Sequence, residues 1–291
     1  MKPFVRLSEV VLIGTIAVVV SAPHASAQWP AHATPAVPKT ADGKPDLTGP
    51  TPRTADGKPD LSGLWIRGDG QLGPAGGGTL RTTPPTFSAG PPVTTFRDVG
   101  ANMKEGLPLQ PWAADLVKAR RAENQKDNPD AHCLPMGLMQ FHNHGQPRKI
   151  VQTPGLILIM YEANYGLRQI FMDGRKLPGP DAQPWWYGYS IGRWEGDTLV
   201  VDTTNFNDQT RFRGSTDALH VVERFTRVGP RALLYRFTID DPNTWARSWT
   251  GEYAWPATDE RLYEYACHEA NYALGDILRG ARLREADAKK K

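Results

Sequence analysis

Residues 187–204, YGYSIGRWEGDTLVVDTT, decide the fold class of this 291-residue chain. Two β-rich runs, Tyr187–Trp194 and Thr198–Thr204, flank the turn residues Glu195-Gly196-Asp197, which is the pattern of a β-hairpin. A link of this length is too short for a parallel crossover, and the two strands must therefore be antiparallel neighbours. The same pattern recurs on both sides of this stretch.

Further strand-like runs are separated mostly by short turns such as Pro154-Gly155 and Asp173-Gly174. They are Ile150–Thr153, Leu156–Glu162, Leu167–Met172, His220–Arg227, Ala232–Ile239, Trp249–Trp255 and Arg261–Cys267. The sequence therefore predicts a mainly β fold. We expect an antiparallel meander of about eight or nine strands that closes into a lipocalin-like barrel or forms a two-layer sandwich.

One or two helices are expected to flank the sheet. A helix near residues 111–125 would begin at Pro111, with Trp112, Leu116 and Ala119 on one face. A second, amphipathic helix is expected near residues 272–284. Both belong to a single β-rich domain predicted for residues 61–291.

Residues 28–60 are rich in Pro and Gly and are predicted to be irregular. The octapeptide TADGKPDL occurs twice, at residues 40–47 and 54–61, which indicates a local duplication. The second copy continues into Ser62-Gly63-Leu64-Trp65, the expected entry to the folded domain.

The first 27 residues have the pattern of a secretory signal peptide. Lys2 and Arg6 precede an apolar run from Val10 to Val20, and residues 25–27, Ala-Ser-Ala, match a cleavage site. We therefore expect cleavage near Ala27 and a periplasmic or secreted protein, with no transmembrane span in the mature chain. Cleavage would change the net charge from +3 to +2, which gives no electrostatic footprint for nucleic acid.

The chain has two cysteines, Cys133 and Cys267. An even number of cysteines in an exported protein favours a disulfide bond, because oxidising compartments rarely keep free thiols. The sequence therefore predicts a Cys133–Cys267 bridge, with two buried thiols as the alternative.

Several sequence blocks are long and specific. They are ADGKPDLSGLW (55–65), CLPMG (133–137), IVQTPGLILIMYE (150–162), MDGR (172–175), IGRWEGDTLVVDTTNFND (191–208), HVVERF (220–225) and IDDP (239–242). On these blocks, residues 55–267 resemble a family of exported bacterial proteins. The resemblance implies export but brings no established activity with it, and the lipocalin-like barrel is an analogy that does not fix function.

Charged side chains within the β-rich runs are the candidate ligand-binding residues. Arg168, Asp202, His220 and Arg224 lie within runs that otherwise alternate apolar residues. Because a buried charge is costly without a partner or a purpose, we predict that these four side chains point into a shared cavity and anchor a ligand. Glu223 and Trp186 complete the predicted site, the latter as part of an apolar wall. The alternative is a solvated outer face of the sheet.

Other catalytic or metal-binding patterns are weak. His142 and His144 form a His-x-His pair, a spacing that a metal ion can use, and no other cofactor is expected. The sequence contains no G-x-S-x-G, P-loop, H-E-x-x-H or strand-linked G-x-G-x-x-G motif.

These observations predict an exported protein that binds a small apolar or aromatic ligand through a few polar anchors. One alternative is a hydrolase, lyase or isomerase that uses Asp, Glu or His in the same cavity. Another is a structural partner of an envelope complex. The oligomeric state is not indicated by the sequence.

Overall fold

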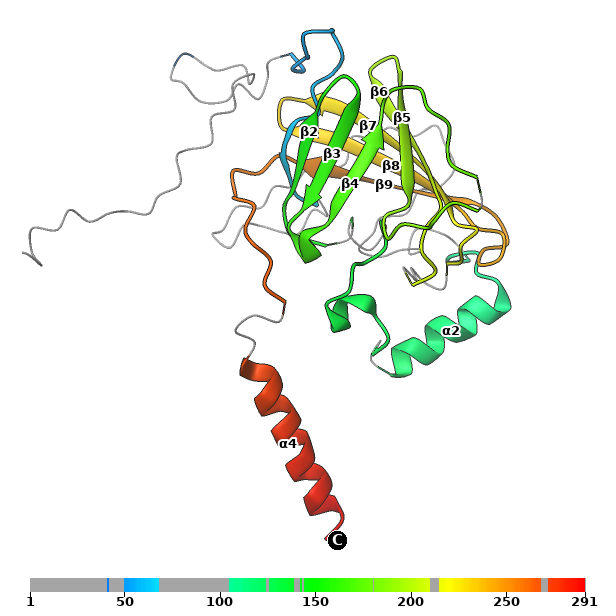
Figure 1. Ribbon diagram of the computed structural model, residues 1–291, viewed down its shortest axis with the longest axis vertical. Coiled ribbons are helices and arrows are strands. Elements are labelled where there is room, and N and C mark those ends of the chain that lie inside the picture. The colour runs from blue at the N-terminus through cyan, green and yellow to red at the C-terminus, as the bar shows by residue number, and fades with distance from the viewer. Residues whose placement is uncertain are drawn as a thin grey trace, which may run out of the picture. The chain divides into compact units, whose positions relative to one another are not determined.

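The hairpins predicted from the sequence join into one sheet of nine strands in a computed structural model of the protein (Figure 1). The structure describes residues 41, 50–67, 105–123, 126–138, 142, 144–179, 181–209, 215–267 and 272–290. Four predictions lie outside these residues: the signal peptide, most of the first TADGKPDL copy, most of the irregular segment 28–60 and the end of the first helix at residues 124–125.

The strands follow one another in the sheet in chain order. They are β1 (Gly63–Trp65), β2 (Arg148–Gln152), β3 (Leu156–Tyr161), β4 (Leu167–Phe171), β5 (Tyr189–Glu195), β6 (Thr198–Thr204), β7 (His220–Gly229), β8 (Ala232–Asp240) and β9 (Trp249–Pro256). The mainly β fold class is thereby confirmed.

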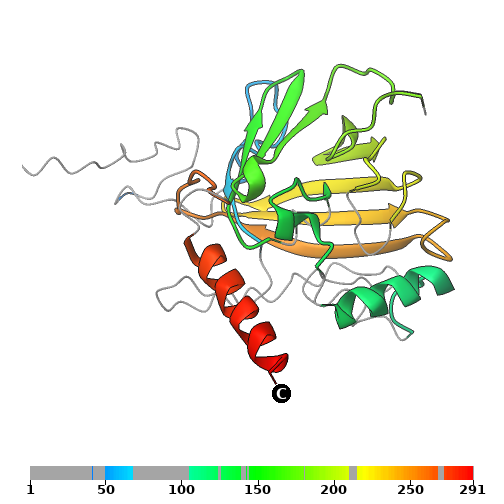
Figure 2. The ribbon, with the colours of Figure 1, turned by 60° about the horizontal axis from the view of Figure 1, so that its bottom comes forward.

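The sheet curls into a half-barrel, and Figure 2 shows β2–β4 standing at a steep angle over β7–β9. Its two edge strands meet at one end through an antiparallel bridge between Trp65 and Ala257. The Ile66 amide donates to the Pro256 carbonyl at 3.0 Å, and the Thr258 amide donates to the Leu64 carbonyl at 3.0 Å. A single sheet whose edges meet in this way is barrel-like rather than a two-layer sandwich.

Two features of the sheet differ from the prediction. The β4–β5 pair is parallel, through the residue pairs Ile170–Ser190 and Phe171–Ile191. The connection of residues 172–188 is long enough for such a crossover, which hairpin logic does not anticipate. Residues 261–267, which were predicted to form the last strand, form none. The short strand β1, which was not predicted, brings the total to nine.

The helices are close to their predicted ranges. They are α2 (Pro111–Ala122) and α4 (Tyr272–Ala288), with short 3₁₀ turns at Pro129–His132 and Ala163–Tyr165. Within α2, Ala113 is buried, whereas Trp112 and Ala119 of the face identified from the sequence are exposed. The Trp112 indole donates instead to the Asn243 carbonyl at 2.7 Å. Among the described residues, no helix has both the length and the apolar character needed to span a membrane.

The core fills the inner face of the curled sheet. Alternate residues of β6–β8 point inward, so that Val201, Phe225, Tyr235 and Phe237 are buried in one cluster with Trp255 of β9. The predicted Cys133–Cys267 bond is confirmed, with Cα atoms 5.9 Å apart and 134 residues between the cysteines in sequence. It joins the segment before β2 to the segment after β9.

Reduction of the disulfide is expected to lower the free energy of unfolding. A loop of this length predicts a loss of up to about 4–5 kcal/mol, because the reduced unfolded chain gains conformational entropy. Urea unfolding with and without dithiothreitol measures the difference. A Cys133→Ser/Cys267→Ser variant should not respond to dithiothreitol, and equal stability of reduced and oxidised native protein would contradict the prediction.

Candidate functional site

Arg168 and Glu223 form an ion pair on the inner face of the sheet. Arg168 lies on β4 and Glu223 on β7, and both side chains are fully buried. The Arg168 Nη1 donates to Glu223 Oε1 at 3.0 Å, and its Nη2 donates to Oε2. The pair is bidentate, the geometry in which a guanidinium best compensates a carboxylate.

Hydroxyl groups from β5, β6 and β8 complete the hydrogen bonds of this ion pair. Arg168 Nε donates to Ser190 Oγ at 3.0 Å, and its Nη2 donates to Thr203 Oγ1 at 2.9 Å. The Tyr235 hydroxyl donates to Glu223 Oε1 at 2.8 Å. Each Arg168 nitrogen therefore has a partner, as a charge removed from water requires.

His142 extends the buried network toward β3. Its Nε2 lies 2.5 Å from the Tyr161 hydroxyl, and its Nδ1 lies 3.8 Å from Glu223 Oε1. Burial lowers the pKa of His142 well below its usual value, and the positive charges of Arg148 and Arg168 lower it further. Burial also raises the pKa of Tyr161. Both side chains are therefore neutral at neutral pH.

A second buried arginine anchors the segment that carries His142. Arg148 of β2 donates to the carbonyl oxygens of His142 at 3.3 Å and of His144 at 2.7 Å. Its guanidinium carbon lies 4.6 Å from the centroid of the Trp255 ring, a cation–π contact. Backbone carbonyls and an aromatic face thus stabilise this charge.

The four side chains predicted to share one cavity lie on opposite faces of the sheet, so that prediction is wrong. Arg168 points inward, whereas Asp202, His220 and Arg224 lie on the outer face and are partly exposed. There, His220 bonds to Asp202, and Arg224 Nη2 donates to Glu195 Oε2 at 2.8 Å. Because successive side chains of a strand alternate, Glu223 and Arg224 cannot share a face. The solvated outer face was the correct interpretation for these three residues.

Trp186 is half-buried and lies in the turn before β5. Of the six predicted ligand-binding residues, only Arg168 and Glu223 are brought into contact within the core. Whether any of the six binds a ligand stays a prediction.

The two predicted metal ligands point to different partners. His142 Nε2 contacts Tyr161, while His144 Nδ1 lies 3.1 Å from Gln146 Oε1. In the part of the chain that the structure describes, no group of three or more His, Cys, Asp or Glu side chains is placed to hold a metal ion. The spacing of the pair therefore does not translate into a shared site.

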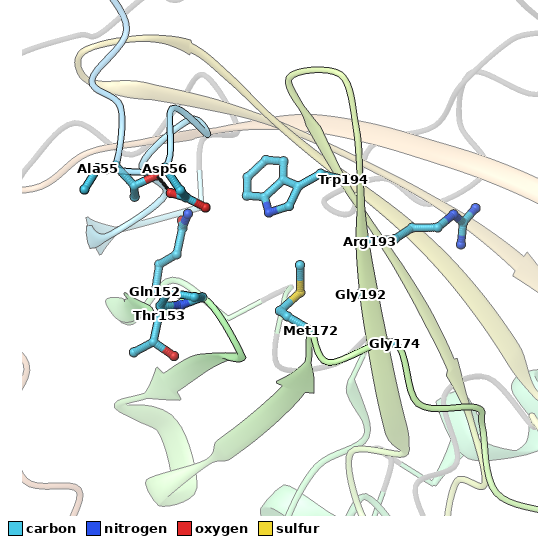
Figure 3. Close-up of a pocket in the computed structure, with 11 residues that line it drawn as sticks. Ala55, Asp56, Gln152, Thr153, Met172, Gly174, Gly192, Arg193 and Trp194 are labelled. Carbon is cyan, nitrogen blue, oxygen red and sulfur yellow. Dashed lines mark hydrogen bonds between the residues drawn. The ribbon is translucent and has the colours of Figure 1, made fainter.

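A pocket of about 520 Å³ lies where β4 ends and β5 continues (Figure 3). Four segments distant in sequence line it, namely Thr54–Asp56, Gln152–Pro154, Met172 with Gly174, and Gly192–Trp194. Figure 3 shows Trp194 and Met172 pointing toward the space between these segments, while Arg193 points away from it.

The register of the strands explains the position of the pocket. The last β4–β5 pair is Phe171–Ile191, and β5 then runs on to Glu195 without β4 beside it. A side chain at Gly192 would collide with Met172 Sδ and with Ile170, so the glycine lets Met172 pack against β5. The inward-facing Trp194 then lies beyond the end of β4.

The second TADGKPDL copy forms one wall of the pocket. It folds into a tight turn in which the Thr54 amide donates to the Lys58 carbonyl at 2.8 Å. Arg53 joins this turn to the β5–β6 hairpin, since its Nη1 donates to Asp197 Oδ1 at 3.0 Å. On the other side, the Leu61 amide donates to Gln152 Oε1 at 2.8 Å, and Gln152 Nε2 donates to the Pro59 carbonyl at 3.1 Å. The wall is therefore fixed to both β2 and β5.

No protein-family model, curated protein or solved structure matches this chain. The pocket must therefore be interpreted from its own geometry. Sequence reasoning missed its residues because it searched for charges inside strands, whereas the pocket is built from turns and strand ends. Asp56, Gln152, Met172 and Trp194 each lie in a different one of the sequence blocks quoted above.

Substitution of Arg168 is expected to destabilise the protein far more than substitution of Arg224. Arg168→Ala leaves Glu223 buried without its cation and should cost on the order of 3–5 kcal/mol. Arg224→Ala removes a pair that is about 40% exposed on both sides, and should cost less than about 1 kcal/mol. Urea unfolding of both variants checks this, and similar losses would contradict the assigned faces.

Stability is also expected to fall as the pH drops below about 6.5, the usual pKa of histidine. His142 stays neutral in the folded protein, whereas in the unfolded chain it binds a proton below that pH, which favours unfolding. The free energy of unfolding should therefore fall by up to about 1.4 kcal/mol per pH unit more steeply in the native protein than in His142→Gln. Urea unfolding between pH 7.5 and pH 5 measures both slopes, and parallel slopes would contradict the prediction.

Proposed function

We propose that this is an exported protein that binds a small molecule in the pocket between β4, β5 and the turn at residues 54–57. The observation that carries the proposal is the pocket itself. Its volume of about 520 Å³ falls in the range typical of small-molecule sites. It also lies at a break in the sheet, where side chains from several elements converge.

The lining suits a ligand with an apolar or aromatic body. The Trp194 indole, the Met172 thioether and Pro154 offer apolar surface, and Trp194 and Met172 also pack against the core. Both side chains are only partly buried, so part of their surface is available to a ligand. A few polar groups at the rim, including Asp56, would fix the orientation of the ligand.

The resemblance to exported bacterial proteins supports the same location. Of the eleven residues around the pocket, all but Thr54 fall within the blocks beginning at Ala55, Ile150, Met172 and Ile191. These blocks are far apart in the chain and converge at the pocket.

Export is supported by two independent observations. Residues 1–27 have the pattern of a signal peptide, and the Cys133–Cys267 bond is of a kind that persists in oxidising compartments. A periplasmic or secreted location also suits a binding protein that meets its ligand outside the cytoplasm.

The proposal is tested with N-phenyl-1-naphthylamine, a neutral apolar fluorophore whose emission rises in apolar sites. The native protein should bind it, and Trp194→Ala should weaken binding by about tenfold or more, since losing the indole contact removes at least roughly 1.4 kcal/mol. Ala55→Phe should abolish binding, because Ala55 lines the pocket and is exposed, so a phenyl group can fill the space without disturbing the core.

Ala114→Phe is the matched control, since Ala114 is an exposed alanine on α2 outside the pocket. This variant should bind like the native protein. Equal binding by the native protein and Ala55→Phe would place the fluorophore elsewhere and overturn the proposed site.

A further inference from the structure

The charges around the pocket indicate the class of its ligand. Two of its lining residues carry formal charge, Asp56 and Arg193. Their side chains point in different directions and have different partners. This difference decides which charge a ligand in the pocket would meet.

The charge of Arg193 is compensated on the outer face of the sheet. Its neighbours Gly192 and Trp194 face inward, so alternation turns Arg193 outward, as Figure 3 shows. There its Nη2 donates to Glu195 Oε1 at 2.8 Å, and its Nη1 lies 3.6 Å from Asp202 Oδ2. An anionic ligand in the pocket would therefore not find a guanidinium available.

Asp56 is differently placed. It is exposed at the wall of the pocket, and its Oδ1 accepts a hydrogen bond from the Thr54 hydroxyl at 2.5 Å. The nearby cation Arg53 binds Asp197 through both terminal nitrogens. Among the described residues, no salt bridge neutralises the Asp56 carboxylate, so the pocket presents a negative charge.

The remaining polar side chains on the wall are already engaged by the backbone. Gln152 bonds with Leu61 and Pro59, and the Thr153 hydroxyl donates to the Leu156 carbonyl at 2.6 Å. The groups left to recognise a ligand are the Asp56 carboxylate and the Trp194 indole. A carboxylate attracts a cation, and the face of an indole binds one better than any other side-chain ring does.

We infer that the pocket binds a small organic cation, a protonated amine or quaternary ammonium group carried on an apolar or aromatic body. The cationic group lies beside the Asp56 carboxylate, and the body packs against Trp194 and Met172. This inference rests on the proposed function and adds the charge of the ligand to it.

Three probes with the same aromatic ring but different charge test the inference: benzyltrimethylammonium, benzyl alcohol and phenylacetate. Each probe is titrated into the native protein, and binding is followed by calorimetry and by the chemical shifts of the Trp indole protons. The affinity should be highest for the cationic probe, lower for benzyl alcohol and lowest for phenylacetate. The cation is expected to bind about tenfold more tightly than benzyl alcohol.

Variants of Asp56 separate charge recognition from pocket integrity. Asp56→Asn should bind the cation no more tightly than it binds benzyl alcohol, and Asp56→Glu should retain the preference for the cation. Asp115→Asn makes the same change of charge on α2, outside the pocket, and should behave like the native protein. A higher salt concentration should weaken the binding of the cationic probe and of no other probe.

The outcomes distinguish the two levels of the proposal. Equal or tighter binding of benzyl alcohol or phenylacetate, lost in Ala55→Phe, would overturn the cationic class and leave the binding pocket in place. If Asp56→Asn still preferred the cationic probe, the inference of a cationic ligand would also be overturned. Binding of none of the three probes, together with no fluorophore binding, would overturn the proposed function itself.

Discussion

The buried ion pair between Arg168 and Glu223 is the interaction on which the arrangement of the sheet depends. The backbone pairing of β4 with β5 covers only Ile170–Ser190 and Phe171–Ile191. Arg168 compensates for this short junction by bonding to β5, β6 and β7 through Ser190, Thr203 and Glu223. A charge pair held away from water requires all of these partners, so the four strands must keep one register.

The pocket of Figure 3 lies close to this junction. The Arg168–Glu223 ion pair and His142 are fully buried on the inner face of the half-barrel, where His142 packs against the rings of Tyr235 and Trp255. Just beyond the junction that Arg168 holds, β4 ends and β5 continues, and the inner face of β5 is uncovered at Trp194. The rigid core and the adjacent break in the sheet therefore have the same cause, the short parallel pairing.

The outer face shows how the same residue types behave in a different environment. Asp202, His220, Arg193 and Arg224 pair across strands in contact with water, where each pair contributes little to stability. Inside, Glu223 and Arg168 compensate each other's charge away from water. One position along β7, from Glu223 to Arg224, separates these two situations.

The sequence by itself determined the class of fold, eight of the nine strands, both helices to within a few residues, and the pairing of the two cysteines. These follow from local rules: alternation, hairpin turns, a proline at a helix start and an even number of thiols. The sequence could not determine which charged residues face inward, because His220–Arg227 carries charge on both faces and alternation alone does not say which face is buried. Nor could it place the parallel junction or the pocket, since both depend on contacts between turns that are far apart in the chain. Only the tertiary structure decided those, because folding of the sheet brings residues 54–56, 152–154, 172, 174 and 192–194 to one place.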